Sequence, residues 1–237
     1  MQILIEDTKK LAQKAGEELS KALEKNKGKD ILLMLSGGSA FKVLEHVDTE
    51  TLSDKITISA VDERFSMDPE VNNFSQIEQT DFFDACLEKE CAIIGTRIHK
   101  TETLPAAVMN FDGQLQRWHK ACPKGVVIAL LGIGEDAHTA GVFPFPESKR
   151  LFDDLFLDEE WVASFDATGK HEHTLRFTVT LTFLKENVDH AVVYAQGAKK
   201  KDALQKIADT SLEIHEVPAK IFNDMKDVVL FTDQEIS

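Results

Sequence analysis

A carboxylate and an imidazole stand two residues apart near the middle of the chain. Asp136 and His138 follow an apolar run at residues 126–131 and two glycines. An imidazole is partly neutral at neutral pH and can take a proton from water, and a nearby carboxylate can orient it or stabilise its charged form. The loop therefore predicts a general-base site with His138 and Asp136 as catalytic residues. We expect His138 to lie in the first turn of a short helix that ends before Pro144.

A second loop combines glycines with hydroxyl groups. Ser36, Gly37, Gly38 and Ser39 follow an apolar run at residues 31–35 and precede a short helical pattern. Glycines let a backbone approach a ligand closely, and the N–H groups at the start of a helix attract anions such as phosphate. These four residues are candidate substrate-binding residues. A plain strand-to-helix turn is the alternative, since the Gly-Lys-Ser/Thr of a Walker A loop is absent.

Charged residues also follow the apolar run at residues 56–61. Arg64 offers a planar fork of donors that suits phosphate or carboxylate, and Asp62 or Glu63 could hold that fork or contact sugar hydroxyls. Arg176 alternates with apolar neighbours and could reach toward the same site, and Lys199 follows an apolar run at residues 191–195. The alternatives are an ion pair in a solvated loop and, for Lys199, a basic surface patch.

The elements that must position these loops can be read from apolar periodicity. Four continuous apolar runs, at 31–35, 56–61, 126–131 and 191–195, have the length of strands buried on both faces. Helical patterns cover 7–26, 75–89, 103–120 and 199–208. This alternation predicts an α/β fold with a doubly wound, mostly parallel sheet flanked by helices, in one domain over residues 1–237. Residues 161–165 and 175–180 predict a small antiparallel edge or second sheet. Ligands of such sheets bind at the carboxyl ends of the strands, where the three loops lie.

Composition narrows the class of partner. The hydrophobic share is 43%, and 41 acidic against 27 basic residues give a net charge of -14. This charge opposes non-specific attraction to nucleic acid or anionic membrane, and no apolar run approaches the length of a membrane span. The cysteines Cys86, Cys91 and Cys122 form neither an even disulfide set nor a close zinc pair, which fits a cytoplasmic protein. The composition leaves a monomer and a small homo-oligomer both open.

Two weaker patterns have plainer alternatives. Gly132-x-Gly134-x-x-Ala137 fits the loose dinucleotide fingerprint, but the prolines that follow soon after leave no room for the long helix such a turn needs. His171 and His173 could share one face of a strand, as a metal site needs. A polar loop is the favoured interpretation, and we expect no metal and no organic cofactor.

Taken in order, several motifs resemble the 6-phosphogluconolactonase family, which is related to the glucosamine-6-phosphate deaminases. They are Ser36-Gly37-Gly38-Ser39, Asp62-Glu63-Arg64-Phe65-Ser66, Asn72-Asn73-Phe74, the segment at 131–144, Arg176-Phe177-Thr178-Val179-Thr180 and Gly197-Ala198-Lys199-Lys200-Lys201. The resemblance implies hydrolysis of 6-phospho-glucono-1,5-lactone to 6-phosphogluconate, a step of the oxidative pentose phosphate pathway, without metal or organic cofactor. It implies that His138 activates water, that Asp136 is the acid of the same motif, and that the glycine turn and Arg64 lie near the phosphate of the substrate. Arg176 and Lys199 match further basic positions.

The chain departs from the family pattern next to the proposed base. Ala137 stands where the family usually has glycine, and a Cβ there restricts backbone angles that glycine allows. Two other hypotheses therefore stay beside the lactonase: a phosphosugar-binding protein without turnover, and an amino-sugar-phosphate deaminase or isomerase.

Overall fold

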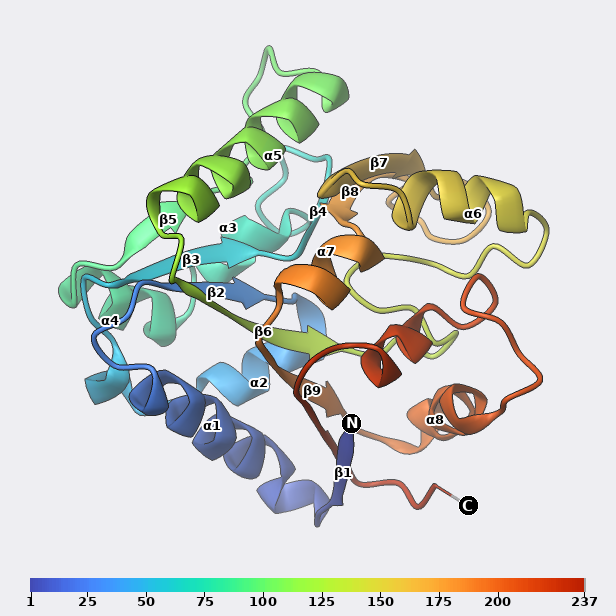
Figure 1. The fold of residues 1–237 in the computed structure, drawn as a ribbon, viewed down its shortest axis with the longest axis horizontal. Coiled ribbons are helices and arrows are strands. Elements are labelled where there is room, and N and C mark those ends of the chain that lie inside the picture. The colour runs from blue at the N-terminus through green and yellow to red at the C-terminus, as the bar shows by residue number, and fades with distance from the viewer. Residues whose placement is uncertain (237) are drawn as a thin grey trace.

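The computed structural model describes residues 1–236, and its central feature is a seven-stranded sheet whose neighbouring strands are all parallel (Figure 1). The strand order is β1-β10-β9-β6-β2-β3-β5. The strands are β1 (Gln2–Ile5), β2 (Ile31–Leu35), β3 (Ile56–Ala60), β5 (Ala92–Ile94), β6 (Val126–Gly132), β9 (His190–Ala195) and β10 (Val228–Thr232). The predicted mostly parallel sheet is confirmed.

A second sheet of three antiparallel strands stands beside the first. Its order is β4 (Asp62–Arg64), β8 (Leu175–Val179) and β7 (Val162–Asp166). This confirms the predicted small second sheet, although the charged segment at 62–64, expected as a loop, is itself a strand. Val61 alone connects β3 to β4. Its N–H donates to Leu35 O at 3.0 Å, its carbonyl accepts from Val179 N at 2.9 Å, and its side chain is fully buried. One residue therefore ties the two sheets together.

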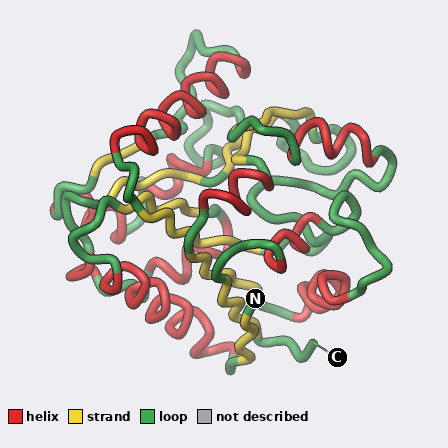
Figure 2. Tube along the Cα trace, viewed as in Figure 1, coloured by secondary structure: helices red, strands yellow, loops and turns green. Residues whose placement is uncertain are grey.

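Helices cover both faces of the parallel sheet, as Figure 2 shows. Side chains alternate along β2: Leu33 packs with α1 (Thr8–Lys25), whereas Met34 belongs to the apolar cluster that includes residues of α5 (Leu104–Ala121). The first face also carries α2 (Phe41–Leu44), α3 (Asn73–Ile77) and α4 (Asp81–Glu88). The second carries α6 (Lys149–Phe156), α7 (Leu181–Asn187), α8 (Lys201–Ala208) and the small sheet. Short 3₁₀ segments are η1 (Gly38–Ala40), η2 (Thr49–Thr51), η3 (Ala198–Lys200) and η4 (Pro218–Asn223).

One predicted helix is wrong in its extent. Residues 75–89 were expected to form a single helix, but α3 ends at Ile77 and α4 begins after Thr80. Thr80 has extended backbone angles, and its hydroxyl accepts a hydrogen bond from Phe83 N at 3.2 Å. A threonine in this role is a helix N-cap, so it starts a new helix rather than continuing the old one.

Within residues 1–236 there is no helix with the length and apolar character needed to span a membrane. The three cysteines are free, and Cys86 and Cys91 are buried.

Candidate active site

A cavity of about 200 Å³ opens at the carboxyl ends of β2 and β6. These two strands are neighbours at the centre of the sheet, where the chain order runs outward in both directions, and such a switch point is where open α/β sheets bind ligands. The cavity brings together eight residues proposed from the sequence: Ser36, Gly37, Gly38, Ser39, Asp62, Arg64, His138 and Arg176. Asp136 joins them through its contact with His138.

His138 and Asp136 form a tight pair at one side of the cavity. His138 Nδ1 lies 2.6 Å from Asp136 Oδ1, and the same oxygen accepts the backbone N–H of His138 at 3.1 Å. Burial works to raise the pKa of Asp136, but the hydrogen bonds and charge of His138 outweigh it and lower that pKa below its usual value. The carboxylate therefore holds a proton on Nδ1, which leaves Nε2 as the basic nitrogen. The imidazole also packs on Phe143, with ring centroids 4.6 Å apart.

The segment after β6 is a series of turns, so the expectation of a helix around His138 is wrong. Ala137 and Ala140 have φ values of +70° and +47°, and Gly141 has a φ of +69°. Left-handed residues spaced this closely cannot continue a right-handed helix. Ala137 adopts the conformation that favours glycine, and its methyl group is fully buried in the core rather than in the cavity.

Gly134 makes room for the imidazole. A Cβ at this position would lie 1.9 Å from His138 Nδ1 and 2.6 Å from Asp136 Oδ1. The glycine is therefore required by the close approach of the ring, not by a left-handed backbone.

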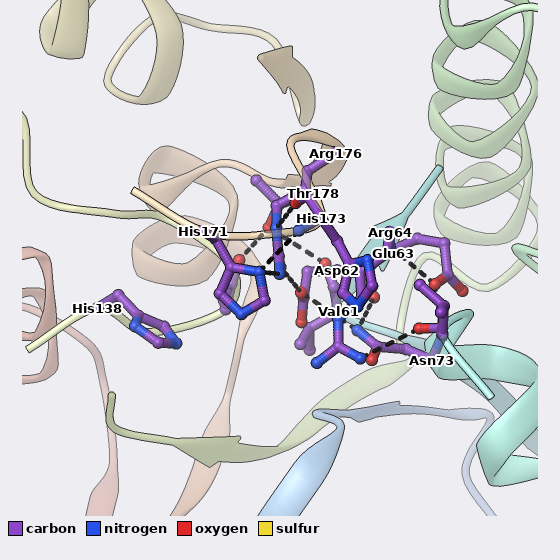
Figure 3. A network of polar contacts seen from close by, with 12 residues as sticks. Val61, Asp62, Glu63, Arg64, Asn73, His138, His171, His173, Arg176 and Thr178 are labelled. Atoms are coloured by element: carbon purple, nitrogen blue, oxygen red, sulfur yellow. Dashed lines mark hydrogen bonds and ion pairs between the residues drawn. The ribbon is translucent and has the colours of Figure 1, made fainter. Parts of the chain in front are cut away.

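The opposite side of the cavity is one face of the small sheet. Arg64 and Arg176 are cross-strand partners, and Asp62 is opposite Thr178 two residues away. Side chains two apart share a face of a sheet, so Asp62, Arg64 and Arg176 point the same way, as Figure 3 shows. Like charges directly opposite each other are unfavourable unless an anion lies between them. This face of the sheet therefore favours an anionic ligand.

The protein provides one carboxylate, Asp62, for the two guanidinium groups of Arg64 and Arg176. Arg176 Nη1 lies 3.4 Å from Asp62 Oδ2, and the Arg176 side chain is 5% exposed. Burial lowers the pKa of Arg176, Asp62 opposes that shift and Arg64 adds to it. Arg64 donates from Nη1 to Val71 O at 3.1 Å, while its buried Nε has no hydrogen-bond partner among residues 1–236. We refer to Arg64, Arg176 and Asp62 as the arginine seat.

Glu63 points away from the arginine seat and holds the segment beneath it. Its carboxylate accepts the backbone N–H groups of Arg64 at 2.8 Å, Asn73 at 2.5 Å and Phe74 at 2.9 Å, and the hydroxyl of Thr96 at 2.8 Å. Burial raises the pKa of Glu63 to about 8, and the bonds from Phe74, Asn73 and Thr96 oppose the rise. Glu63 thus fixes β4 to the start of α3.

We expect Glu63→Gln to lower the free energy of unfolding by about 1–3 kcal/mol, because the amide NH₂ of glutamine faces a backbone N–H that needs an acceptor. A raised pKa means that protonation of Glu63 favours the folded state, so its stabilising contribution falls as the pH rises from 4.5 toward 8. The destabilisation should therefore be larger at pH 5 than at pH 8. Urea unfolding at both pH values measures it.

The exposed Glu88→Gln in α4 is the control, and we expect it to change stability by less than about 0.5 kcal/mol at either pH. Equal unfolding midpoints for the Glu63 and Glu88 variants would contradict the role given to Glu63.

Lys199 does not line the cavity, so the structure does not support its placement in the binding site. Its side chain is 80% exposed and pairs with Glu135 at 3.3 Å. The next residue, Lys200, lines the cavity instead; burial lowers its pKa, opposed by Glu135 and Asp136. Lys199 and Lys200 lie in the 3₁₀ turn η3, where neighbouring side chains point in different directions. Three consecutive lysines in a sequence do not show which one faces the cavity.

Two further cavity residues were missed by the sequence analysis. Asn73 donates from Nδ2 to Asp62 O at 3.0 Å and to Asp62 Oδ2 at 3.2 Å, and a Cβ at Gly37 would lie 2.6 Å from its Oδ1. His171, interpreted as part of a polar loop, also lines the cavity. Among residues 1–236, no group of three or more His, Cys, Asp or Glu side chains is placed to hold a metal ion.

Comparison with known proteins finds related chains. The family described as glucosamine-6-phosphate isomerases/6-phosphogluconolactonase matches residues 6–231. A 6-phosphogluconolactonase of Nostoc sp. is 26% identical over 211 residues, which are 85% of this chain and 81% of the relative.

Solved structures agree on the fold. The 6-phosphogluconolactonase from Plasmodium vivax has a TM-score of 0.75 at 22% identity and covers 97% of this chain and 89% of its own. That from Trypanosoma brucei has a TM-score of 0.74 at 17% identity and covers 98% and 95%. This chain therefore shares its overall α/β fold with these structures.

Proposed function

Because the chain belongs to the family of glucosamine-6-phosphate isomerases and 6-phosphogluconolactonases, we propose that it hydrolyses 6-phospho-glucono-1,5-lactone to 6-phosphogluconate. The single observation that carries this proposal is the cavity itself. It has a carboxylate-bound imidazole at one side and the arginine seat at the other, so one sugar phosphate can contact both.

The base chemistry follows from the His138–Asp136 pair. Asp136 keeps the proton of the neutral imidazole on Nδ1, so Nε2 can accept a proton from a water molecule. That water then attacks C1 of the lactone, the C1–O bond to the ring oxygen breaks, and the proton passes from the imidazolium to the leaving oxygen. A lactone carbonyl is already electrophilic, and this sequence needs no covalent intermediate on the enzyme.

The arginine seat supplies the binding energy. A phosphate dianion placed between Arg64 and Arg176 relieves the repulsion of the two guanidinium groups and gives the free Nε of Arg64 an acceptor. The turn formed by Ser36, Gly37 and Gly38 completes this part of the cavity. Binding at the phosphate holds C1 near His138, and fixed positioning of this kind lowers the barrier.

Freshly generated 6-phosphogluconolactone, added with and without the enzyme, tests the proposal. We expect acid release well above the spontaneous rate. Ammonia release from glucosamine 6-phosphate would instead support the deaminase, and tight binding of 6-phosphogluconate without any hydrolysis would support a binding protein.

We expect Gly134→Ala to lower kcat about 100-fold, because the added methyl group occupies the space of His138 Nδ1 and forces the imidazole out of position. The fold should be unaffected, since the His138 side chain is 33% exposed and can turn toward solvent. Steady-state kinetics and a thermal melt measure the two effects.

Gly113→Ala in α5 is the matched control, because the Cβ there meets only the flexible end of Arg117. Wild-type kcat in Gly134→Ala would show that the position of the imidazole is unimportant.

A further inference from the structure

We propose that His171 is a substrate-binding residue whose Nε2–H donates a hydrogen bond to the phosphorylated end of the bound sugar. The proposal rests on the function given to the cavity above and adds a residue to it. His171 stands in the segment between β7 and β8 and lines the cavity beside the arginine seat.

The contacts of Nδ1 determine which nitrogen of His171 carries the proton. Nδ1 accepts the backbone N–H of His173 at 3.1 Å and lies 3.3 Å from Arg176 Nη2. A backbone N–H and a guanidinium can only donate, so Nδ1 must be an unprotonated acceptor. Burial and the positive charges of Arg176 and Arg64 lower the pKa of His171, which keeps the ring neutral. A neutral ring with a bare Nδ1 has its proton on Nε2.

The Nε2–H group is free to meet a ligand. Over the described part of the chain Nε2 has no hydrogen-bond partner, and in Figure 3 this nitrogen is on the side of the ring turned away from Arg176. In the same view His171 lies between His138 and the Arg176–Asp62 pair. His138, His171, Asp62 and Arg176 all line one cavity, so a sugar phosphate bound there can reach this donor.

Phe143 fixes the ring of His171 relative to the other groups of the site. The Phe143 ring centroid is 5.9 Å from that of His171, 4.6 Å from that of His138 and 5.1 Å from Arg176 Cζ. Phe143 is itself 2% exposed. Three polar groups thus pack around one buried phenyl ring, and His171 and Phe143 together form part of the wall of the cavity.

Because its ring is neutral, His171 can bind a phosphate oxygen without the repulsion that a third cationic side chain would add. Arg64 and Arg176 are already opposite each other on neighbouring strands, and the one carboxylate of the arginine seat, Asp62, is paired with Arg176. A further cation would add repulsion, whereas a neutral N–H adds a hydrogen bond to a phosphate oxygen without adding charge. This contact is made before the reaction begins, so its loss should raise KM rather than lower kcat.

Two substitutions separate donation by Nε2 from support of Arg176. His171→Asn keeps an acceptor near the position of Nδ1 but removes the donor, and His171→Gln keeps an N–H near the position of Nε2 but removes the acceptor. We expect His171→Asn to raise KM for the lactone and Kd for 6-phosphogluconate about tenfold with kcat little changed, and His171→Gln to stay within about threefold of wild type.

A larger effect of His171→Gln than of His171→Asn would overturn the proposal, because it would show that His171 only holds Arg176. Wild-type values for both variants would also overturn it. Calorimetric titration with 6-phosphogluconate keeps this test independent of turnover. A wild-type protein that binds 6-phosphogluconate and hydrolyses no lactone would refute the proposed reaction and still leave the ranking of the variants to decide the role of His171.

Discussion

Replacing His138 by glutamine should lower kcat for lactone hydrolysis by about 10²–10⁴-fold, the range by which a positioned general base accelerates a reaction. Glutamine keeps an N–H near the position of Nε2, loses the contact of Nδ1 with Asp136, and has no nitrogen that accepts a proton from water. KM should change little, because the arginine seat, which we propose to bind the phosphate, is untouched. Initial rates of acid release, corrected for spontaneous hydrolysis, measure the effect.

His99→Gln is the control for this experiment. His99 is exposed and does not line the cavity, so its removal should leave kcat unchanged. If His138→Gln retains the wild-type rate while its melting temperature is normal, His138 is not the base and the proposed mechanism fails.

Replacing Arg64 by glutamine should lower kcat/KM by about 10²–10³-fold, because two charge-assisted hydrogen bonds to the phosphate are lost. Arg64→Lys should recover only part of this loss, since an ammonium keeps the charge but not the planar fork. Steady-state kinetics at substrate concentrations below KM give the ratio directly.

Stability should change much less than activity. Arg64 lies directly opposite Arg176 in the small sheet, so the neutral variant loses a repulsion of about 0.2–1 kcal/mol, and it also loses the hydrogen bond to Val71 O, which is worth about 0.5–1.5 kcal/mol. The two effects oppose each other, and the melting temperature should stay close to that of wild type. A side chain that served only the fold would show the reverse. Arg150→Gln, in α6 and fully solvated, should alter neither quantity.

The strands that carry the site were predictable because each is a continuous apolar run buried on both faces. The runs at 31–35, 56–61, 126–131 and 191–195 correspond to β2, β3, β6 and β9. The edge strand β1 was missed because it is short and largely exposed, and β5 has only three residues. The apolar run at 228–232, which forms β10, did carry a signal that the sequence analysis passed over.

The sequence was enough to predict which loops form the candidate site. It was not enough to predict which of their side chains point into the cavity. Side chains alternate between the two faces of a strand, so Asp62 and Arg64 share a face. This could be inferred only once residues 62–64 were known to form a strand. His171 reaches the cavity through contacts with Arg176 and His173, which are tertiary and leave no pattern in the sequence. The helix expected at His138 failed because two alanines there adopt positive φ, a conformation that their residue type disfavours.

The single-residue connection at Val61 sets the distance between the two sides of the cavity. The hydrogen bonds of Val61 to Leu35 and Val179 join the small sheet to β2, so the spacing between the guanidinium pair and the imidazole is set by the fold. Under the proposed reaction, such a scaffold measures its substrate: a phosphorylated lactone with a shorter carbon chain, held by its phosphate, leaves its carbonyl short of the water that His138 activates.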